Sequence, residues 1–176
     1  MDYLKPQKWQ QSGIVWLWVA LLVIALDQVT KDWVLETYQL YQVEAVWPIF
    51  NLTYVRNYGA AFSFLHDAGG WQRWLFTSLA VGVSLLLSYW LRNQPRALWR
   101  VNLCYVLIIG GAIGNLVDRL QHGFVVDFLD FYWGSYHFPA FNVADIAISC
   151  GAALLILEAF YPQKLSGYPT KDDAEG

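Results

Sequence analysis

The sequence is poor in charge, histidine and cysteine. Charged residues make up 14% of its 176 residues, whereas about 25% is usual in a soluble domain. The formal net charge is -3 and there is no long basic run, which argues against nucleic acid as a partner. The histidines are scattered, and neither an HExxH motif nor a glycine-rich phosphate loop is present. We therefore expect no metal and no other cofactor.

The two cysteines, Cys104 and Cys150, both fall in apolar segments. They lack the CxxC spacing of a clustered metal site. Isolated cysteines in such surroundings usually behave as small hydrophobic side chains. We expect both to be buried in this way.

Hydrophobic residues, by contrast, make up 57% of the chain, and the mean hydropathy is +0.33. A transmembrane helix needs about 20 largely apolar residues, and four segments meet this requirement, at about residues 14–34, 74–91, 98–120 and 141–161. The apolar stretch of the first begins late and lacks a small-residue cleavage site, so we expect no cleavable signal peptide. The length favours one domain, residues 1–176.

Lysine and arginine favour one orientation of these spans. Basic residues are concentrated before span one, between spans two and three, and after span four (Lys5, Lys8, Arg92, Arg96, Arg100, Lys164 and Lys171). The connection between spans one and two holds only Arg56 and the flanking Arg73, and residues 121–140 hold none. The positive-inside rule then places both termini in the cytoplasm.

The connection between spans one and two is expected to form a small β element at about residues 40–66. Phe50, Leu52 and Tyr54 occupy alternate positions, which is typical of a strand, and Asn57-Tyr58-Gly59 supplies turn residues. The expected fold is an α-helical integral membrane protein with four transmembrane helices and a small extracytoplasmic β element between helices one and two.

The connection between spans three and four, residues 121–140, is rich in aromatic residues. Aromatic side chains are enriched where a membrane meets water, so we expect this connection to lie at the outer interface. Asp130, within it, is expected to face water.

The span directions gather strongly polar residues in the outer half of the bilayer. The C-terminal ends of spans one and three and the N-terminal end of span four all face outward. These ends carry Asp27, Lys31, Asn115, Asp118, Arg119, Asn142 and Asp145, and Asp127 follows span three on the same side. A charged residue inside a membrane is costly and is by default a candidate for function.

These charged residues do not all favour the same interpretation. Asp27 and Lys31 are four residues apart, a spacing that favours a structural ion pair within one helix. Asp118 is next to an arginine and is expected to have a structural or orienting role, or simply to pair with that arginine at the interface. Asp127 and Asp145 have apolar neighbours and no cation within helical reach, so we expect function from this pair, hereafter the dyad.

Five motifs occur in order along the chain: Asp27–Lys31, Asn57–Ser63, Gly114–Arg119, Val125–Phe128 and Phe141–Asp145. Together they closely resemble the lipoprotein signal peptidases (signal peptidase II) of bacteria. Each motif is weak alone, but five in order over four spans, from about residue 14 to 160, form a specific match. One departure is Ile146, where the family usually has a small polar residue.

The resemblance implies an aspartyl endopeptidase of the bacterial cytoplasmic (inner) membrane. Its substrates would be prolipoproteins with a lipobox cysteine that carries diacylglycerol, and it would cut just before that cysteine. Asp127 and Asp145 would be the catalytic pair, and Asp27 and Lys31 would stabilise the fold. The matching residues that would bind substrate or support the dyad are Asn57, Gly59, Asn115, Asp118, Arg119 and Asn142.

The chemistry of two carboxylates agrees with such an enzyme. Two carboxylates at short range in a low-dielectric site hold one proton between them. The ionised one can take a proton from water, while the protonated one donates to the scissile carbonyl oxygen. The active site would face the outer leaflet and the lipids around it, and we expect a monomer.

Two other classes of function remain open at this point. Intramembrane carboxylates also act as relays in a proton-coupled transporter or channel, and a non-enzymatic scaffold is the second alternative. A conduit needs polar groups through both leaflets, whereas the inward halves of these spans are nearly free of them, and no internal repeat is evident. A scaffold has no need of two apolar-flanked carboxylates on one side.

Overall fold

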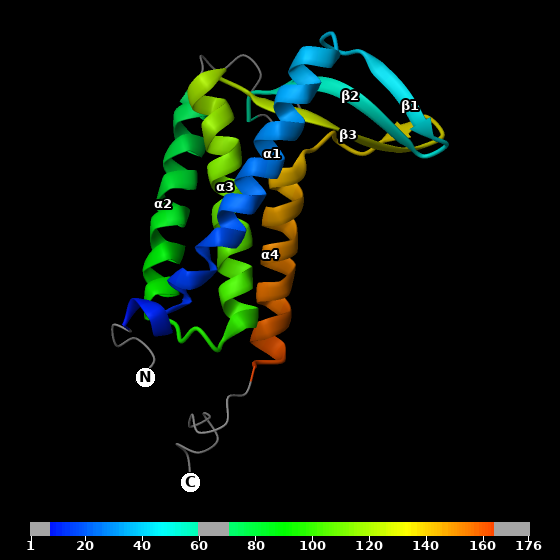
Figure 1. Cartoon of the computed structure of the whole chain (residues 1–176). Coiled ribbons are helices and arrows are strands. Elements are labelled where there is room, and N and C mark those ends of the chain that lie inside the picture. Colours follow the sequence, from blue (N-terminus) through cyan, green and yellow to red (C-terminus); the bar gives the residue numbers. More distant parts are fainter. Residues whose placement is uncertain (1–7, 60–70, 164–176) are drawn as a thin grey trace.

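Four long helices form a bundle with a β-sheet at one end in the computed structural model, which describes residues 8–59 and 71–163 (Figure 1). The helices are α1 (Leu17–Thr37), α2 (Trp71–Asn93), α3 (Trp99–Gln121) and α4 (Val143–Phe160), and two short 3-10 helices, η2 (Trp9–Gln11) and η3 (Gly13–Trp16), precede α1. The spans Gly13–Thr37, Trp71–Asn93, Trp99–Gln121 and Val143–Phe160 are long and apolar enough to cross a membrane. The predicted fold class is therefore confirmed. Lys5, Lys164, Lys171 and the predicted β and motif residues from 60 to 66 lie outside the described residues.

Helix α3 is the centre of the bundle. In its most apolar part 61% of residues are buried, against 22% or fewer in the other three helices. Glycines let its neighbours approach: a Cβ on Gly110 would lie 3.0 Å from the carbonyl oxygen of Ala20 in α1. A Cβ on Gly151 of α4 would lie 2.9 Å from the carbonyl oxygen of Cys104 in α3. Without a hydrophobic driving force in lipid, such close packing is what holds helices together.

The sheet is antiparallel, with the order β1 (Val43–Trp47), β2 (Phe50–Asn57), β3 (Val125–Trp133) and β4 (Tyr136–His137). Half of it therefore comes from the connection between α3 and α4, for which the sequence predicted only an interfacial segment. The reason is tertiary: β2 pairs with β3 across more than 60 residues of sequence, from Phe50↔Phe131 to Asn57↔Val125. Val126 and Phe128 of β3 and Tyr54 of β2 are buried with Val34 of α1 in one apolar cluster.

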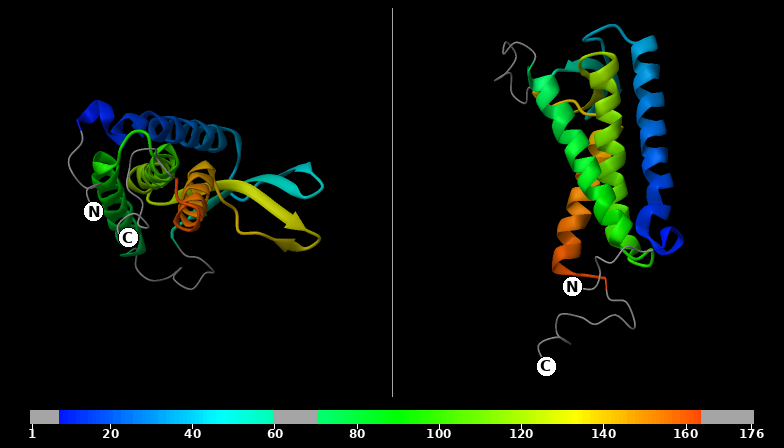
Figure 2. Two further views of the ribbon diagram at one scale, coloured as in Figure 1. Left: turned by 90° about the horizontal axis from the view of Figure 1, so that it is seen from below. Right: turned by 90° about the vertical axis from the view of Figure 1, so that its left-hand side faces the viewer.

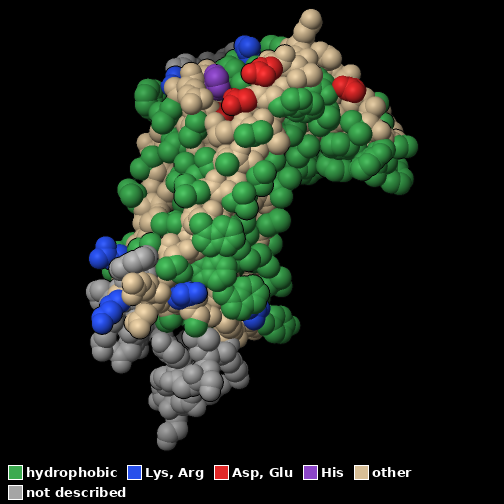
Figure 3. Space-filling model, in the orientation of Figure 1, with side chains coloured by type: hydrophobic (Ala, Val, Ile, Leu, Met, Phe, Trp, Pro, Cys, Tyr) green, Lys and Arg blue, Asp and Glu red, His purple; other side chains and the backbone are tan. Residues whose placement is uncertain are grey.

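The sheet extends sideways beyond α4 and overhangs the flank of the bundle (Figures 1 and 2). Figure 3 shows hydrophobic side chains along the helices and along the side of the sheet that faces them, while Lys and Arg lie mainly at the opposite end. Trp47 is 69% exposed and Trp133 81% exposed, although both are strongly apolar. Exposed apolar surface of this extent in line with membrane spans is what a lipid surface would cover.

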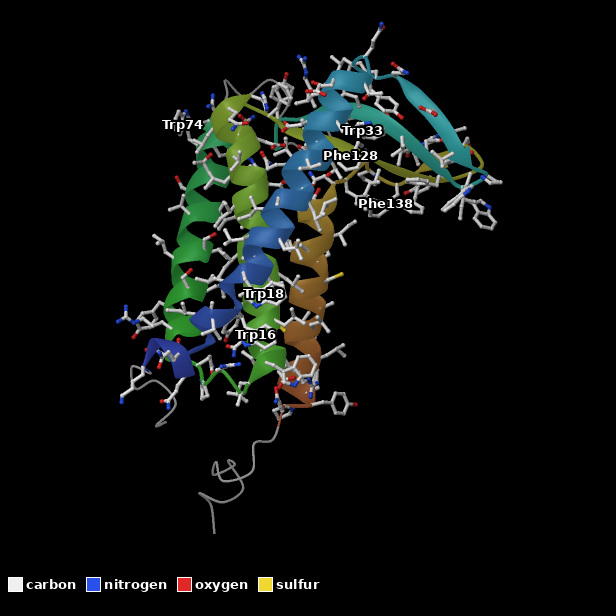
Figure 4. The ribbon with its side chains drawn as sticks, in the orientation of Figure 1. Trp16, Trp18, Trp33, Trp74, Phe128 and Phe138 are labelled. Atoms are coloured by element: carbon white, nitrogen blue, oxygen red, sulfur yellow. The ribbon has the colours of Figure 1, made fainter. Side chains whose placement is uncertain are left out.

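Tryptophans mark two levels along the bundle (Figure 4). Trp16 and Trp18 lie towards the end of the bundle remote from the sheet, whereas Trp33 and Trp74 lie towards the end that carries the sheet. Indole rings favour both membrane–water interfaces, so these two levels agree with the spans assigned above.

Two predictions about burial are wrong. Cys104 is buried, but Cys150 is exposed, because α4 buries Ala144, Ala147 and Gly151 and Cys150 lies outside this buried stripe. Asp130 is 6% exposed and does not face water, since the register of the sheet places it directly opposite Asn51. Asn51 Nδ2 donates to Asp130 Oδ2 at 2.8 Å, and His137 Nδ1 lies 2.9 Å from the same carboxylate.

Candidate active site

Asp127 is the third residue of β3 and is 2% exposed. Because side chains alternate along a strand, it shares a face with Val125, while Val126 and Phe128 point into the apolar cluster. Its Oδ2 accepts a hydrogen bond of 2.9 Å from Asn57 Nδ2, and its Oδ1 accepts one of 2.7 Å from Asn142 Nδ2. The strand thus presents one carboxylate to two amide donors.

Asp145 lies in the first turn of α4. Asn142 is the N-cap residue, and its Oδ1 accepts from the Asp145 N–H at 2.9 Å, while the Asn142 N–H donates to Asp145 Oδ2 at 3.3 Å. This reciprocal capping box fixes the side chain, and the N-terminal end of a helix favours a negative charge. Asn115 of α3 donates to Asp145 Oδ1 at 2.8 Å.

Asn142 is therefore bonded to both residues of the dyad, and the structure brings the dyad together. Burial is the main cause that raises the pKa of Asp127 to about 7, and the charge of Asp145 is the next. Hydrogen bonds from Asn57 and Asn142 act in the opposite direction, as does the charge of Lys31.

Three asparagines face the dyad. The side-chain oxygen of each accepts a hydrogen bond from a group that can only donate, and this fixes the orientation of the amide. The Gly59 N–H donates to Asn57 Oδ1 at 2.8 Å, and the Asp145 N–H occupies Asn142 Oδ1. Lys31 Nζ donates to Asn115 Oδ1 at 2.9 Å. An ammonium or backbone N–H has no acceptor lone pair, so each oxygen must face it and each NH2 must face a carboxylate.

Behind the dyad lies a buried cluster of charges. Lys31 Nζ is 2.8 Å from Asp27 Oδ2 and 3.0 Å from Asp118 Oδ2. Asp118 thus pairs with Lys31 of α1, so the alternative of an interfacial pair with the neighbouring Arg119 is wrong. Gln28 Nε2 bonds both carboxylates, at 3.2 Å to Asp27 and 3.0 Å to Asp118. The sequence analysis assigned no role to Gln28, although a polar residue within an apolar span could have indicated one.

Two further predicted residues lie at the margin of the site. Arg119 Nη1 donates to the carbonyl of Asn115 at 3.1 Å, and its guanidinium lies 5.4 Å from the ring centre of Phe76. Gly59 has a φ of +91°, and a Cβ there would lie 2.6 Å from Cδ2 of Phe76. A residue other than glycine would thus be strained and would also clash.

A groove with a volume of about 430 Å³ opens beside Asp145, on the side of α4 below the overhanging sheet. Figure 4 shows Phe138 at this position, under the sheet and close to α4. Its lining is mainly apolar and consists of Phe138, Pro139, Ala140, Phe141, Asp145, Ile146, Ser149 and Cys150. The groove includes Asp145 of the dyad and the exposed residues Ile146 and Cys150 of α4.

Comparisons with known proteins decide the family. The sequence model of signal peptidase (SPase) II matches residues 19–161. The chain belongs to the signal peptidase II family. Lipoprotein signal peptidases of Shewanella halifaxensis and Shewanella pealeana are 65% and 64% identical to it over 159 residues, which is 90% of this chain and 94% of each relative.

Solved structures agree with this membership. Two structures described as a bacterial membrane enzyme, at 2.3 Å and 1.9 Å resolution, align with TM-scores of 0.73 and 0.72 and 28% sequence identity. They cover 91% and 87% of this chain, and 98% of each solved chain is matched. As a signal peptidase II family member with four spans, the chain is a protease and a multi-pass protein of the bacterial inner membrane. The transporter or channel alternative is not favoured.

No group of three or more potential metal ligands occurs among residues 8–59 and 71–163. The described side chains that converge on this signal peptidase II site are carboxylates, amides and one ammonium group.

Proposed function

We propose that the chain is an aspartic endopeptidase that removes signal peptides from diacylglyceryl-modified prolipoproteins. It cuts just before the lipidated lipobox cysteine, and Asp127 and Asp145 are the catalytic pair. One observation carries this proposal: the buried Asp127 and the half-buried Asp145 share the Asn142 side chain, at the end of the bundle that carries the sheet. The names of the relatives supply the substrate class.

The mechanism follows from the shared proton. One carboxylate is ionised and takes a proton from the attacking water, and the other is protonated and donates to the scissile carbonyl oxygen. Asn57 and Asn142 direct N–H groups at Asp127, and Asn115 directs one at Asp145. Because these donors are held in place before the substrate arrives, no reorganisation is needed during the reaction.

The groove below the sheet suits the lipid of the substrate. The diacylglyceryl group is attached to the residue that directly follows the scissile bond, so it must leave the site within a few bonds of the dyad. The groove includes Asp145, is otherwise mostly apolar and opens to the lipid-facing surface of α4. An apolar groove that opens towards lipid lets the alkyl chains stay out of water while the cysteine reaches the dyad.

The orientation in the membrane follows from charge. Lys8, Arg92, Arg96 and Arg100 lie at or near the end of the bundle remote from the sheet. The positive-inside rule places that end, and both termini, in the cytoplasm. The dyad then faces the outer leaflet, where a lipidated substrate is presented, and the enzyme acts as a monomer.

Purified enzyme in detergent micelles tests the proposal directly. A synthetic lipobox peptide with a diacylglyceryl cysteine should be cut at the bond before that cysteine, which mass spectrometry of the products identifies. The same peptide without the lipid should be cut at least tenfold more slowly. Cleavage at another bond, or proton flux in liposomes without cleavage, would contradict the proposal.

The rate should depend on pH through the shared proton. Because the pKa of Asp127 is raised to about 7, Asp127 loses its proton as the pH rises through this value. Above it kcat should fall, approaching tenfold per pH unit. A plot of kcat against pH from 5 to 9 checks this, and an undiminished rate at pH 9 would exclude a shared proton with this pKa.

Gly59→Ala should lower kcat by roughly tenfold or more, since the left-handed backbone and Phe76 leave no room for a methyl group. Displacement of the Gly59 N–H frees the amide of Asn57 to rotate away from Asp127. Gly134→Ala is the matched control, because Gly134 also has positive φ (61°) but nothing lies within 4 Å of its Cβ position. Equal losses in both variants would mean that strain alone is responsible.

A further inference from the structure

Lys31 uses every hydrogen-bond donor that it has. Its ammonium group carries three N–H bonds, and three acceptors surround it: Asp27 Oδ2, Asp118 Oδ2 and Asn115 Oδ1, at 2.8, 3.0 and 2.9 Å. The residue is 1% exposed, although an ordinary structural lysine reaches for water. It joins one residue of α1 to two of α3.

Each of the two carboxylates bonded to Lys31 also accepts a hydrogen bond from a backbone N–H next to a residue of the dyad. Asp27 Oδ1 accepts from the Ala144 N–H at 2.8 Å, and Ala144 directly precedes Asp145. Asp118 Oδ2 accepts from the Val126 N–H at 2.9 Å, and Val126 directly precedes Asp127. The cluster thus fixes the start of α4 and the start of β3, the two segments that carry the catalytic pair.

The third acceptor of Lys31, the side-chain oxygen of Asn115, is connected to the dyad through the amide of the same side chain. With Lys31 Nζ on its oxygen, Asn115 can present only its NH2 group to Asp145. Asn142 Nδ2 also donates to this Asn115 oxygen, at 3.2 Å, while it bonds Asp127. One ammonium group therefore determines the orientation of an amide that touches Asp145 directly.

We propose that Lys31 is a positioning residue of the peptidase, which sets the separation of Asp127 and Asp145 and the orientation of Asn115 from behind the site. The inference rests on the proposed function of the dyad but goes beyond a stabilising ion pair. An ion pair between Lys31 and Asp27 alone would stabilise α1. The three hydrogen bonds of Lys31 instead lead to both segments that carry the dyad, so the position of Lys31 controls the geometry of the reacting groups. Small displacements of such groups lower the rate strongly.

The test needs a variant that folds without the ammonium group. Lys31→Met alone leaves two buried carboxylates facing each other, so it is combined with Asp27→Asn, which keeps the charge of the cluster unchanged. An asparagine side chain at position 27 still offers an oxygen to the Ala144 N–H. In this double variant kcat on the diacylglyceryl peptide should fall about 30-fold or more, with KM within about threefold of wild type, because the cluster does not touch substrate.

A double-mutant cycle separates positioning from folding. If Lys31 acts partly through Asn115, loss of Lys31 should cost much less kcat in an Asn115→Ala background than in the wild type. If the fold-losses of kcat from the Lys31 and Asn115 substitutions simply multiply, the two residues act independently and the inference is overturned. A kcat within threefold of wild type in the compensated variant would also overturn it. Thr30→Val, on the adjacent position of α1, is the control and should keep wild-type kcat, since Thr30 bonds only carbonyls of its own helix.

A second double variant tests the same inference if the first one does not fold. Lys31→Met with Asp118→Asn preserves the cluster charge from the other side, and an asparagine side chain at position 118 can still accept from the Val126 N–H. It should show the same fall in kcat at unchanged KM. If wild-type enzyme does not cut the lipidated peptide, the proposed function fails; if wild type and both compensated variants cut it equally well, only the role of Lys31 fails.

Discussion

Asp127→Asn and Asp145→Asn are each expected to lower kcat on the diacylglyceryl lipobox peptide by at least about 10³-fold. Neither variant can hold one proton between two carboxylates, so either the base for water or the acid for the carbonyl oxygen is lost. Both side chains remain similar in shape, and substrate should still bind. Single-turnover cleavage, with peptide binding measured separately, distinguishes the chemical step from binding.

Asp130→Asn is the matched control for the dyad variants. Asp130 is also buried and lies on the same strand three residues away, but it bonds Asn51 and His137. The kcat of this variant should stay within a few-fold of wild type. Turnover above about a tenth of wild type in Asp127→Asn or Asp145→Asn would show that the dyad assignment is wrong.

The Asp127→Asn variant should also change how stability depends on pH. In the wild type the pKa of Asp127 is raised from 3.8 to about 7 on folding, chiefly by burial. Between these values the folded state binds more protons than the unfolded state, so stability falls as the pH rises and levels off above about 7. The amide in the variant cannot ionise, so the melting temperature of the variant relative to wild type should rise from pH 5 to pH 8. A constant difference would exclude a raised pKa.

Gly111→Val is expected to lower both the stability of the fold and the activity strongly, the second large effect. Gly111 of α3 faces the start of α4, and a Cβ there would overlap the carbonyl oxygen of Ala144 and lie 2.7 Å from Cγ1 of Ile148. A backbone oxygen cannot move aside as a flexible side chain can. The two helices must separate beside Asp145, and overpacking of this kind costs about 1–3 kcal/mol or more.

Gly82→Ala provides the contrast for Gly111. Gly82 lies within α2, and nothing is within 4 Å of its Cβ position. Alanine there should stabilise the helix by up to about 1 kcal/mol, because glycine is a poor helix former. Thermal unfolding and peptide cleavage of both variants measure the difference. A Gly111→Val protein with normal stability and kcat would show that α3 and α4 do not pack this closely.

The sequence predicted the helices well because each is a local property. A bilayer demands about 20 apolar residues in succession, and that pattern is visible without any knowledge of neighbours. The same locality made the partner of Asp118 uncertain: Arg119 is adjacent in sequence, whereas Lys31 comes from another helix and lies at 3.0 Å. The β3 strand was missed for the same reason, since its partner β2 is remote in sequence.

By itself, the sequence determined the four spans, their order and the two carboxylates that stand without a cation on their own segments. Hydropathy and residue spacing suffice for these, because they depend only on each segment and its solvent. Only the tertiary structure decided that Asn142 bonds both residues of the dyad and that Lys31 anchors the segments behind them. Hydrogen bonds depend on distances of a few tenths of an ångström between remote segments, and only packing sets those distances.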